Sequence, residues 1–86
     1  MTILIDLKNF TLNHNVFIID NNTIISTFKT NTKNLPELVS KTISETNCSE
    51  LNISGNKKYA VNIENKIKQN LLEKYNYTKD LIIKYI

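Results

Sequence analysis

The residues best able to do chemistry in this chain are its single histidine, His14, and its single cysteine, Cys48. A zinc site needs three or four ligands, and a nucleophilic cysteine needs a general base beside it. We expect His14, in the polar segment Asn13-His14-Asn15, to be a solvated turn residue and Cys48 to be a buried thiol. Nothing in the sequence indicates that the two meet, so we predict no catalytic residue, no metal site and no cofactor.

A second candidate is the segment Gly55-Asn56-Lys57-Lys58, which follows an apolar run and opens a helical pattern. Free N–H groups at a helix N-terminus, with two lysines beside them, could contact an anion or a partner. The segment is neither a P-loop nor a dinucleotide-binding fingerprint. We therefore expect an ordinary strand-to-helix turn here, with anion or partner contact as the alternative.

The first third of the chain predicts three strands, at Ile3 to Phe10, Val16 to Ile19 and Thr23 to Thr30. Between the last two, Asp20-Asn21-Asn22-Thr23 indicates a tight turn, because Asn tolerates the left-handed conformation that type I′ hairpins require. Short connections between these strands favour an antiparallel meander.

A helix is predicted from Asn34, its N-cap, to about Thr46, with Glu37 completing a capping box. Its expected buried face is Leu35, Leu38, Val39, Thr42 and Ile43. A fourth strand, Glu50 to Ser54, precedes a second helix from about Asn56 to Tyr75, which Asn76 would stop. The expected buried stripe of that helix is Ala60, Ile63, Ile67 and Leu71, and a fifth strand is expected at Leu81 to Ile86.

Helical connections before the fourth and fifth strands favour parallel pairing through right-handed crossovers, with the fourth strand beside the first. The 86 residues have room for a single domain. The sequence therefore predicts one α/β domain, residues 1–86, with a β-β-β-α-β-α-β order, a five-stranded mixed sheet and two helices.

This order resembles the core of the ribonuclease H-like fold, which includes the Holliday-junction resolvases. The resemblance lies in Ile3-Leu4-Ile5-Asp6, Asp20-Asn21-Asn22 and Ile53-Ser54-Gly55. It implies two metal ions held by carboxylates on the first strand, at the end of the fourth strand and on the helices. Asp6 matches the first position, but the fourth strand ends without a carboxylate, Glu50 is at its other end, and Asp80 precedes the fifth strand. We therefore expect Asp6 to be a vestigial acidic position and the chain to lack nuclease activity.

The composition limits the partners that we expect. All eleven basic residues are Lys, so the chain lacks the arginines that usually contact bases and phosphates. The net charge is only +3. No apolar run approaches the roughly 20 residues of a membrane span, and we expect a cytoplasmic protein without a membrane partner. Abundant Asn, Ile, Lys and Tyr have AT-rich codons, and the chain is similar to small phage proteins from low-GC genomes.

Taken together, these features predict a non-enzymatic binding module that contacts a protein, either a second copy or a host factor. The alternative is a nucleic-acid-associated protein or degenerate nuclease relative that places the lysines of the second helix on phosphates. We expect a homodimer, because a short chain buries a limited core. The strands at Thr23 to Thr30 and at Leu81 to Ile86 have one charge each, Lys29 and Lys84, and are candidates for the contact.

Overall fold

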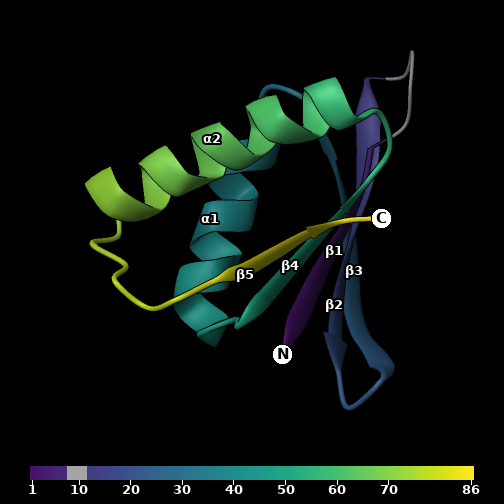
Figure 1. Ribbon diagram of the computed structural model, residues 1–86. Coiled ribbons are helices and arrows are strands. Elements are labelled where there is room, and N and C mark those ends of the chain that lie inside the picture. The colour runs from purple at the N-terminus through teal and green to yellow at the C-terminus, as the bar shows by residue number, and fades with distance from the viewer. Residues whose placement is uncertain (8–11) are drawn as a thin grey trace.

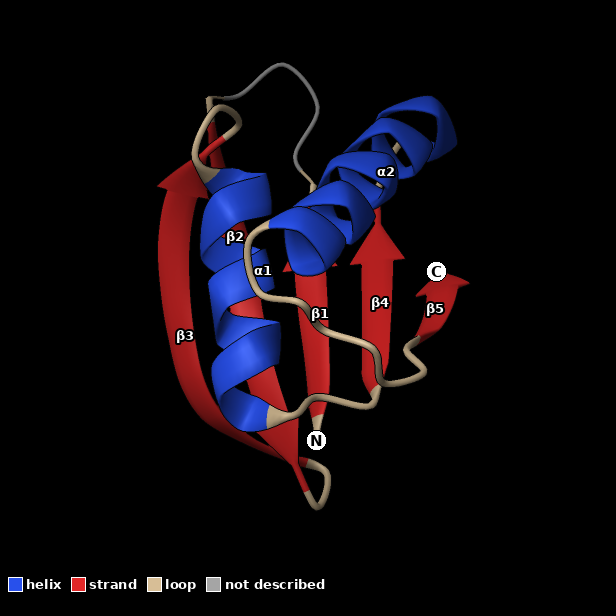
Figure 2. Ribbon diagram, turned by 90° about the vertical axis from the view of Figure 1, so that its left-hand side faces the viewer, coloured by secondary structure: helices blue, strands red, loops and turns tan. Residues whose placement is uncertain are grey.

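The computed structural model describes residues 1–7 and 12–86 and arranges them in two layers (Figure 1). One layer is a five-stranded sheet in the order β3-β2-β1-β4-β5. Both helices lie against the same face of that sheet (Figure 2). The elements, in chain order, are β1 (Thr2–Asp6), β2 (Asn13–Asp20), β3 (Thr23–Asn31), α1 (Leu35–Thr46), β4 (Glu50–Ser54), α2 (Lys57–Glu73) and β5 (Ile82–Tyr85). The predicted element order and mixed sheet are confirmed.

The antiparallel half of the sheet consists of β1, β2 and β3. The turn between β2 and β3 is Asn21-Asn22, and both residues have positive φ, 51° and 62°. This is the left-handed geometry that a two-residue type I′ turn requires, so the predicted tight turn is confirmed. A bulge interrupts the β2–β3 register between Ile18 and Ile19.

The predicted bounds of the first two strands need correction. β1 ends at Asp6, and the Lys8 to Phe10 part of the predicted strand lies outside the described residues. β2 begins at Asn13 instead of Val16, because its pairing with β1 reaches Asn15 and its pairing with β3 reaches Asn13, opposite Asn31. The segment predicted to be a solvated turn is therefore strand.

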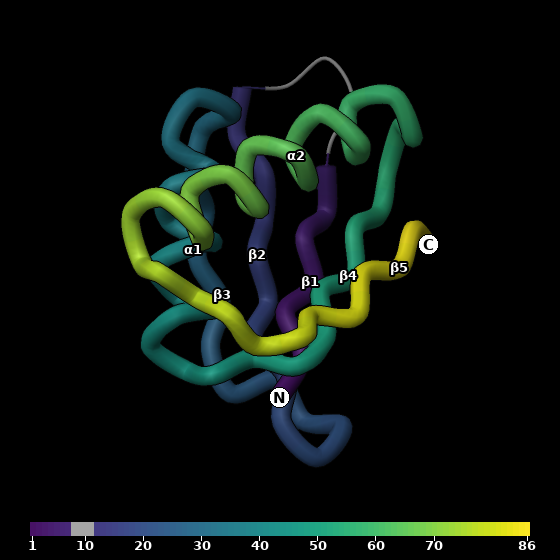
Figure 3. Tube along the Cα trace, turned by 60° about the vertical axis from the view of Figure 1, so that its left-hand side comes forward, coloured from purple at the N-terminus to yellow at the C-terminus, as the bar shows by residue number. Residues whose placement is uncertain are grey.

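The parallel half of the sheet confirms the predicted pairing. β4 lies parallel to β1, with Ile3 beside Leu51 and Ile5 beside Ile53. β5 lies parallel to β4 and carries the C-terminus along the outer edge of the sheet (Figure 3). The two outermost strands are thus β3 and β5.

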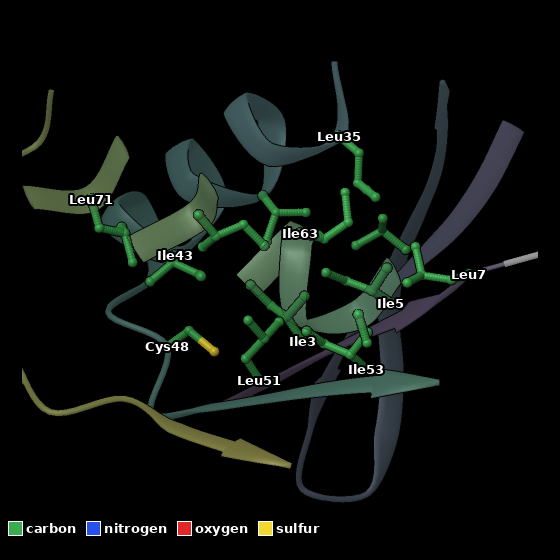
Figure 4. Close-up of a cluster of buried hydrophobic side chains, with 14 residues drawn as sticks. Ile3, Ile5, Leu7, Leu35, Ile43, Cys48, Leu51, Ile53, Ile63 and Leu71 are labelled. Atoms are coloured by element: carbon green, nitrogen blue, oxygen red, sulfur yellow. The ribbon is translucent and has the colours of Figure 1, made fainter. Parts of the chain in front are cut away.

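The core lies between the sheet and the two helices (Figure 4). The predicted stripe of α2 is buried as expected, at Ala60, Ile63, Ile67 and Leu71. Further buried apolar side chains are Ile3, Ile5, Leu7, Val16, Leu35, Val39, Ile43, Cys48, Leu51 and Ile53.

The buried face of α1 is rotated relative to the predicted one. Leu38 is 38% exposed, while Pro36 and Ser40 are buried beside Leu35, Val39 and Ile43. Ser40 can be buried because its hydroxyl donates to the carbonyl oxygen of Pro36 at 2.6 Å, with the carbonyl oxygen of Ile67 at 3.3 Å.

The predicted capping box of α1 is wrong. The Asn34 side chain makes no capping bond, and its backbone N–H donates to Asn31 Oδ1 at 2.8 Å. Glu37 instead contacts the end of α2.

Both helices are followed by an Asn in the left-handed conformation, Asn47 and Asn76. α2 ends at Glu73, two residues before the predicted end.

Candidate functional site

His14 is a buried strand residue, which corrects the expectation of a solvated one. Its side chain is 6% exposed, and its Nε2 lies 2.8 Å from Thr32 Oγ1. Burial lowers the pKa of the imidazole, and the nearby charge of Asp6 opposes that shift. The alternation of His14, Val16 and Ile18 was the sequence signal for a strand that starts before Val16.

Cys48 is buried, as expected, and the fold does not bring it to His14. Its Sγ is a donor to the carbonyl oxygens of Met1, at 3.3 Å, and Glu50, at 3.0 Å. Burial raises the pKa of the thiol, which disfavours the reactive thiolate. Cys48 lies near Met1, at the start of β1. His14 lies on β2 next to Asn15, which pairs with Asp6 at the opposite end of β1.

The Gly55-to-Lys58 segment forms a tight strand-to-helix turn. Gly55 has φ +123°, and a Cβ at this position would lie 2.5 Å from the carbonyl oxygen of Leu7. Asn56 caps α2: its Oδ1 accepts from the backbone N–H groups of Lys58, at 2.9 Å, and Tyr59, at 3.4 Å. The carboxamide oxygen thus occupies the position where an anion would contact these two amides.

The two lysines of this turn do not converge on a common point of contact. Lys57 Nζ lies 5.9 Å from the centre of the Tyr85 ring, a cation–π geometry that draws this charge toward β5. Lys58 is exposed, and its backbone N–H is already bonded to Asn56. The turn therefore has the features of a well-capped helix start more than those of an anion site.

Asp6 ends β1, opposite Asn15 on β2 and beside Ser54 on β4. Ser54 stands where the resemblance would require a second carboxylate. Glu50 is at the far end of β4, where its carboxylate accepts from Lys84 at 3.0 Å and from Asn52 at 3.2 Å. Over residues 1–7 and 12–86, no three His, Cys, Asp or Glu side chains gather as a metal site would require.

Because both helices cover one face, the other face of the sheet is uncovered by any described element (Figure 2). Side chains alternate along each strand, so residues between the buried ones lie on this side. We call it the open face; its members include Leu4, Phe17, Ile19, Asn52, Ile82 and Lys84. Asn52 Oδ1 is buried there without a hydrogen-bond partner among the described residues.

The sequence carries a signal for the open face. The runs Ile3-Leu4-Ile5 and Val16-Phe17-Ile18-Ile19 are apolar at consecutive positions. Such runs are typical of strands that are covered on both faces. In the structure Leu4 and Phe17 are directly opposite each other on β1 and β2.

The β3 edge is a second surface that no described element covers, formed by the outer side of a nine-residue strand. Its one charged residue is Lys29, and Ile24 and Ile25 are 58% and 54% exposed. The Thr32 N–H donates to the Leu12 carbonyl oxygen at 3.1 Å. Bonded and non-bonded pairs alternate along an antiparallel ladder. Counted back from the bonded residue Thr32, Lys29 and Thr27 are non-bonded positions, so their backbone N–H and C=O groups point away from β2.

The β5 edge is shorter and is flanked by charged groups. β5 has four residues. On the open face Lys84 is paired with Glu50, and on the helix side the Tyr85 hydroxyl donates to Glu64, which also pairs with Lys68. Charged side chains beside an edge strand oppose its pairing with another chain, so β3 is the less protected of the two edges.

Residues 1–7 and 12–86 thus form a two-layer α/β protein whose sheet has one uncovered face and two outer edges. Comparisons of the chain with protein-family models, curated proteins and solved structures gave no match. No helix in the described part of the chain is long and apolar enough to cross a membrane. The resemblance to the ribonuclease H-like fold stays a prediction that rests on element order.

Glu37 links the start of α1 to the end of α2 through two hydrogen bonds. Its carboxylate accepts from Lys74 Nζ and from the Tyr75 hydroxyl, both at 2.7 Å. These two hydrogen bonds lower the pKa of Glu37 below its ordinary value of 4.5. A lowered folded-state pKa adds stability above the unfolded-state value and loses it as pH falls through the folded-state pKa.

We therefore expect Glu37→Gln to flatten the acid side of the stability curve. The urea midpoint of the native chain should fall more between about pH 6 and about pH 3 than that of Glu37→Gln. Glu45→Gln is the matched control, because Glu45 lies on the same helix and its ion pair with Lys41, at 4.0 Å, is exposed. Parallel curves for all three proteins would contradict the assignment.

Proposed function

We propose that this protein is a non-enzymatic binding module that acts through protein–protein contacts, in the first place with a second copy of itself. The β3 edge is the observation that carries the proposal. It presents a long strand with one charge, two exposed isoleucines and outward-pointing backbone groups. Such an edge tends to pair with another strand unless the protein blunts or covers it.

The small size of the chain supports the same conclusion. A domain of 86 residues buries a modest share of its surface, and an interface adds apolar burial without adding residues. In the described residues, the open face adds Leu4, Phe17 and Ile19 to the apolar groups that the helices do not cover. An uncovered edge and an uncovered face together favour a protein partner.

The arrangement of lysines favours this function over phosphate binding. On or just after α2, Lys68 is paired with Glu64 at 2.8 Å and Lys74 with Glu37 at 2.7 Å. Lys57 lies over Tyr85, and the first amides of the helix are capped by Asn56. Nucleic-acid binding needs unpaired positive charge concentrated on one surface, so it remains the second candidate.

Self-association is tested by sedimentation velocity from about 10 µM to about 500 µM. We expect the mass to rise from the 10.0 kDa of one chain toward twice that value. The mass should change little with added salt, since the β3 edge has one charge per chain. A 10.0 kDa species at every concentration would reject self-association.

Retention on immobilised DNA or RNA that is lost with salt would favour the second candidate instead. Cleavage of either with Mg²⁺ or Mn²⁺, abolished by Asp6→Asn, would reject the non-enzymatic part of the proposal. Both assays use the native chain and the same preparation, so the three outcomes are separable.

A further inference from the structure

We infer that a second copy of the chain pairs with the β3 edge in an antiparallel, two-fold arrangement in which Phe28 lies opposite Phe28 of the other copy. The inference rests on the proposed self-association and specifies where and how the copies meet. A two-fold interface brings the same strand from both copies, so a self-complementary edge is needed. Antiparallel pairing of β3 with itself meets that requirement.

The regular part of β3 limits the register. The β2–β3 register is continuous from Ser26 to Asn31, and the bulge precedes it. A bulge twists an edge away from flat pairing. Pairing through the Ser26–Asn31 half therefore costs less distortion than pairing through Thr23–Ile25.

Backbone direction restricts the register further. The outward N–H and C=O groups belong to Thr27 and Lys29, so these residues must form the hydrogen-bonded pairs of the new ladder. Centring the two-fold axis on Thr27 would recruit the bulged segment. Centring it on Lys29 would place the two lysines directly opposite each other, which is repulsive.

Centring the axis on Phe28 satisfies all of these conditions. Thr27 of each copy then pairs with Lys29 of the other, so each lysine faces a neutral residue. Moving the axis to Thr30 would leave few residues of β3 in the ladder, because the strand ends at Asn31. The Phe28 register is therefore the one that the edge accommodates best.

The side chains at the seam favour the same register. Phe28 is partly buried and packs against the core from the helix side of the sheet. In the inferred dimer the two Phe28 rings meet on that side, and aromatic pairs across strands stabilise a sheet. The two-fold axis is perpendicular to the sheet, so the open faces of the two copies lie on the same side and form one continuous surface.

Hydrogen exchange of the native chain tests the register without a substitution. The Thr27 and Lys29 amides should exchange at least about tenfold more slowly at about 1 mM than at about 20 µM. The Ile83 and Tyr85 amides are the internal control. They point away from β4, because Ile82 and Ile86 donate to the carbonyl oxygens of Ser49 and Ile53. Their exchange should change much less with concentration.

Thr27→Pro provides the matching variant. Proline removes an N–H that points away from β2, so the ladder within one copy is preserved while the ladder between copies is lost. We expect a monomer with an unchanged circular dichroism spectrum at concentrations where the native chain is dimeric. Thr27→Val, which keeps the N–H, should remain dimeric.

The outcomes separate this inference from the proposed function. A dimer whose Thr27 and Lys29 amides stay unprotected would overturn the inference and leave self-association standing. A monomer at all concentrations would overturn both. If Thr27→Pro does not fold, the exchange data on the native chain decide the question.

Discussion

Gly55→Ala is expected to lower the free energy of unfolding by about 3 kcal/mol or more. Gly55 has φ +123°, a conformation that residues with a side chain rarely adopt. The added Cβ would also lie 2.5 Å from the Leu7 carbonyl oxygen and 2.9 Å from Leu7 Cβ. The close approach is built into the fold, because the Leu7 N–H donates to the Ser54 carbonyl oxygen at 2.9 Å.

Relief of that contact would require the carboxyl ends of β1 and β4, two paired inner strands, to move apart. A domain of this size has a total stability on the order of 5 kcal/mol, so the variant should be largely unfolded or close to it. Urea denaturation followed by circular dichroism measures the effect. Ser54→Ala, one residue earlier, is the control and should cost about 1 kcal/mol or less. A Gly55→Ala midpoint equal to the control would show that the turn relaxes freely.

Ile67→Ala should destabilise the protein by about 2 to 5 kcal/mol, and Ile63→Ala by a similar amount. Ile67 is fully buried and Ile63 is 4% exposed, and both belong to the core cluster. Figure 4 shows Ile63 pointing into that cluster. Truncation removes apolar burial and leaves a cavity that packed neighbours fill only in part. Each variant should therefore lose a large part of its urea resistance.

Leu72→Ala is the matched control on the same helix, because Leu72 is 65% exposed. It should change the free energy of unfolding by less than about 0.5 kcal/mol. A loss below about 1 kcal/mol at both isoleucines would mean that α2 presents another face to the sheet. Equal losses at Leu72 and Ile67 would point to a buried surface on the outer side of α2.

Local chemistry accounts for the features that were predicted correctly. Asn21 and Asn22 specify a hairpin turn because Asn tolerates positive φ, and every non-glycine residue with positive φ in the described ranges is Asn. The spacing of Ala60, Ile63, Ile67 and Leu71 places them on one side of any helix, whatever it packs against. Helical connections between strands dictate parallel pairing.

The errors arose where two local solutions are close in energy. On α1, the predicted buried face includes Leu38 and Thr42, whereas the observed one includes Pro36 and Ser40. The two faces have the same central residues. Burial of Ser40 became favourable through its hydrogen bond to Pro36 and its approach to Ile67, and the latter contact depends on α2. His14 likewise became a strand residue because β3 offers it a partner in Thr30.

The sequence by itself determined the order of the elements, the positions of the turns and the apolar stripe of α2, because these depend on residue conformation and on spacing along the chain. The tertiary structure decided which groups remain uncovered. The open face and the β3 edge exist because both helices pack on one side and β3 ends the sheet. The predicted element order already put Thr23 to Thr30 at or near a sheet edge, and the strand order confirms it. The packing of both helices on one face depends on long-range contacts, so no local pattern in β3 could reveal what is left uncovered beside it.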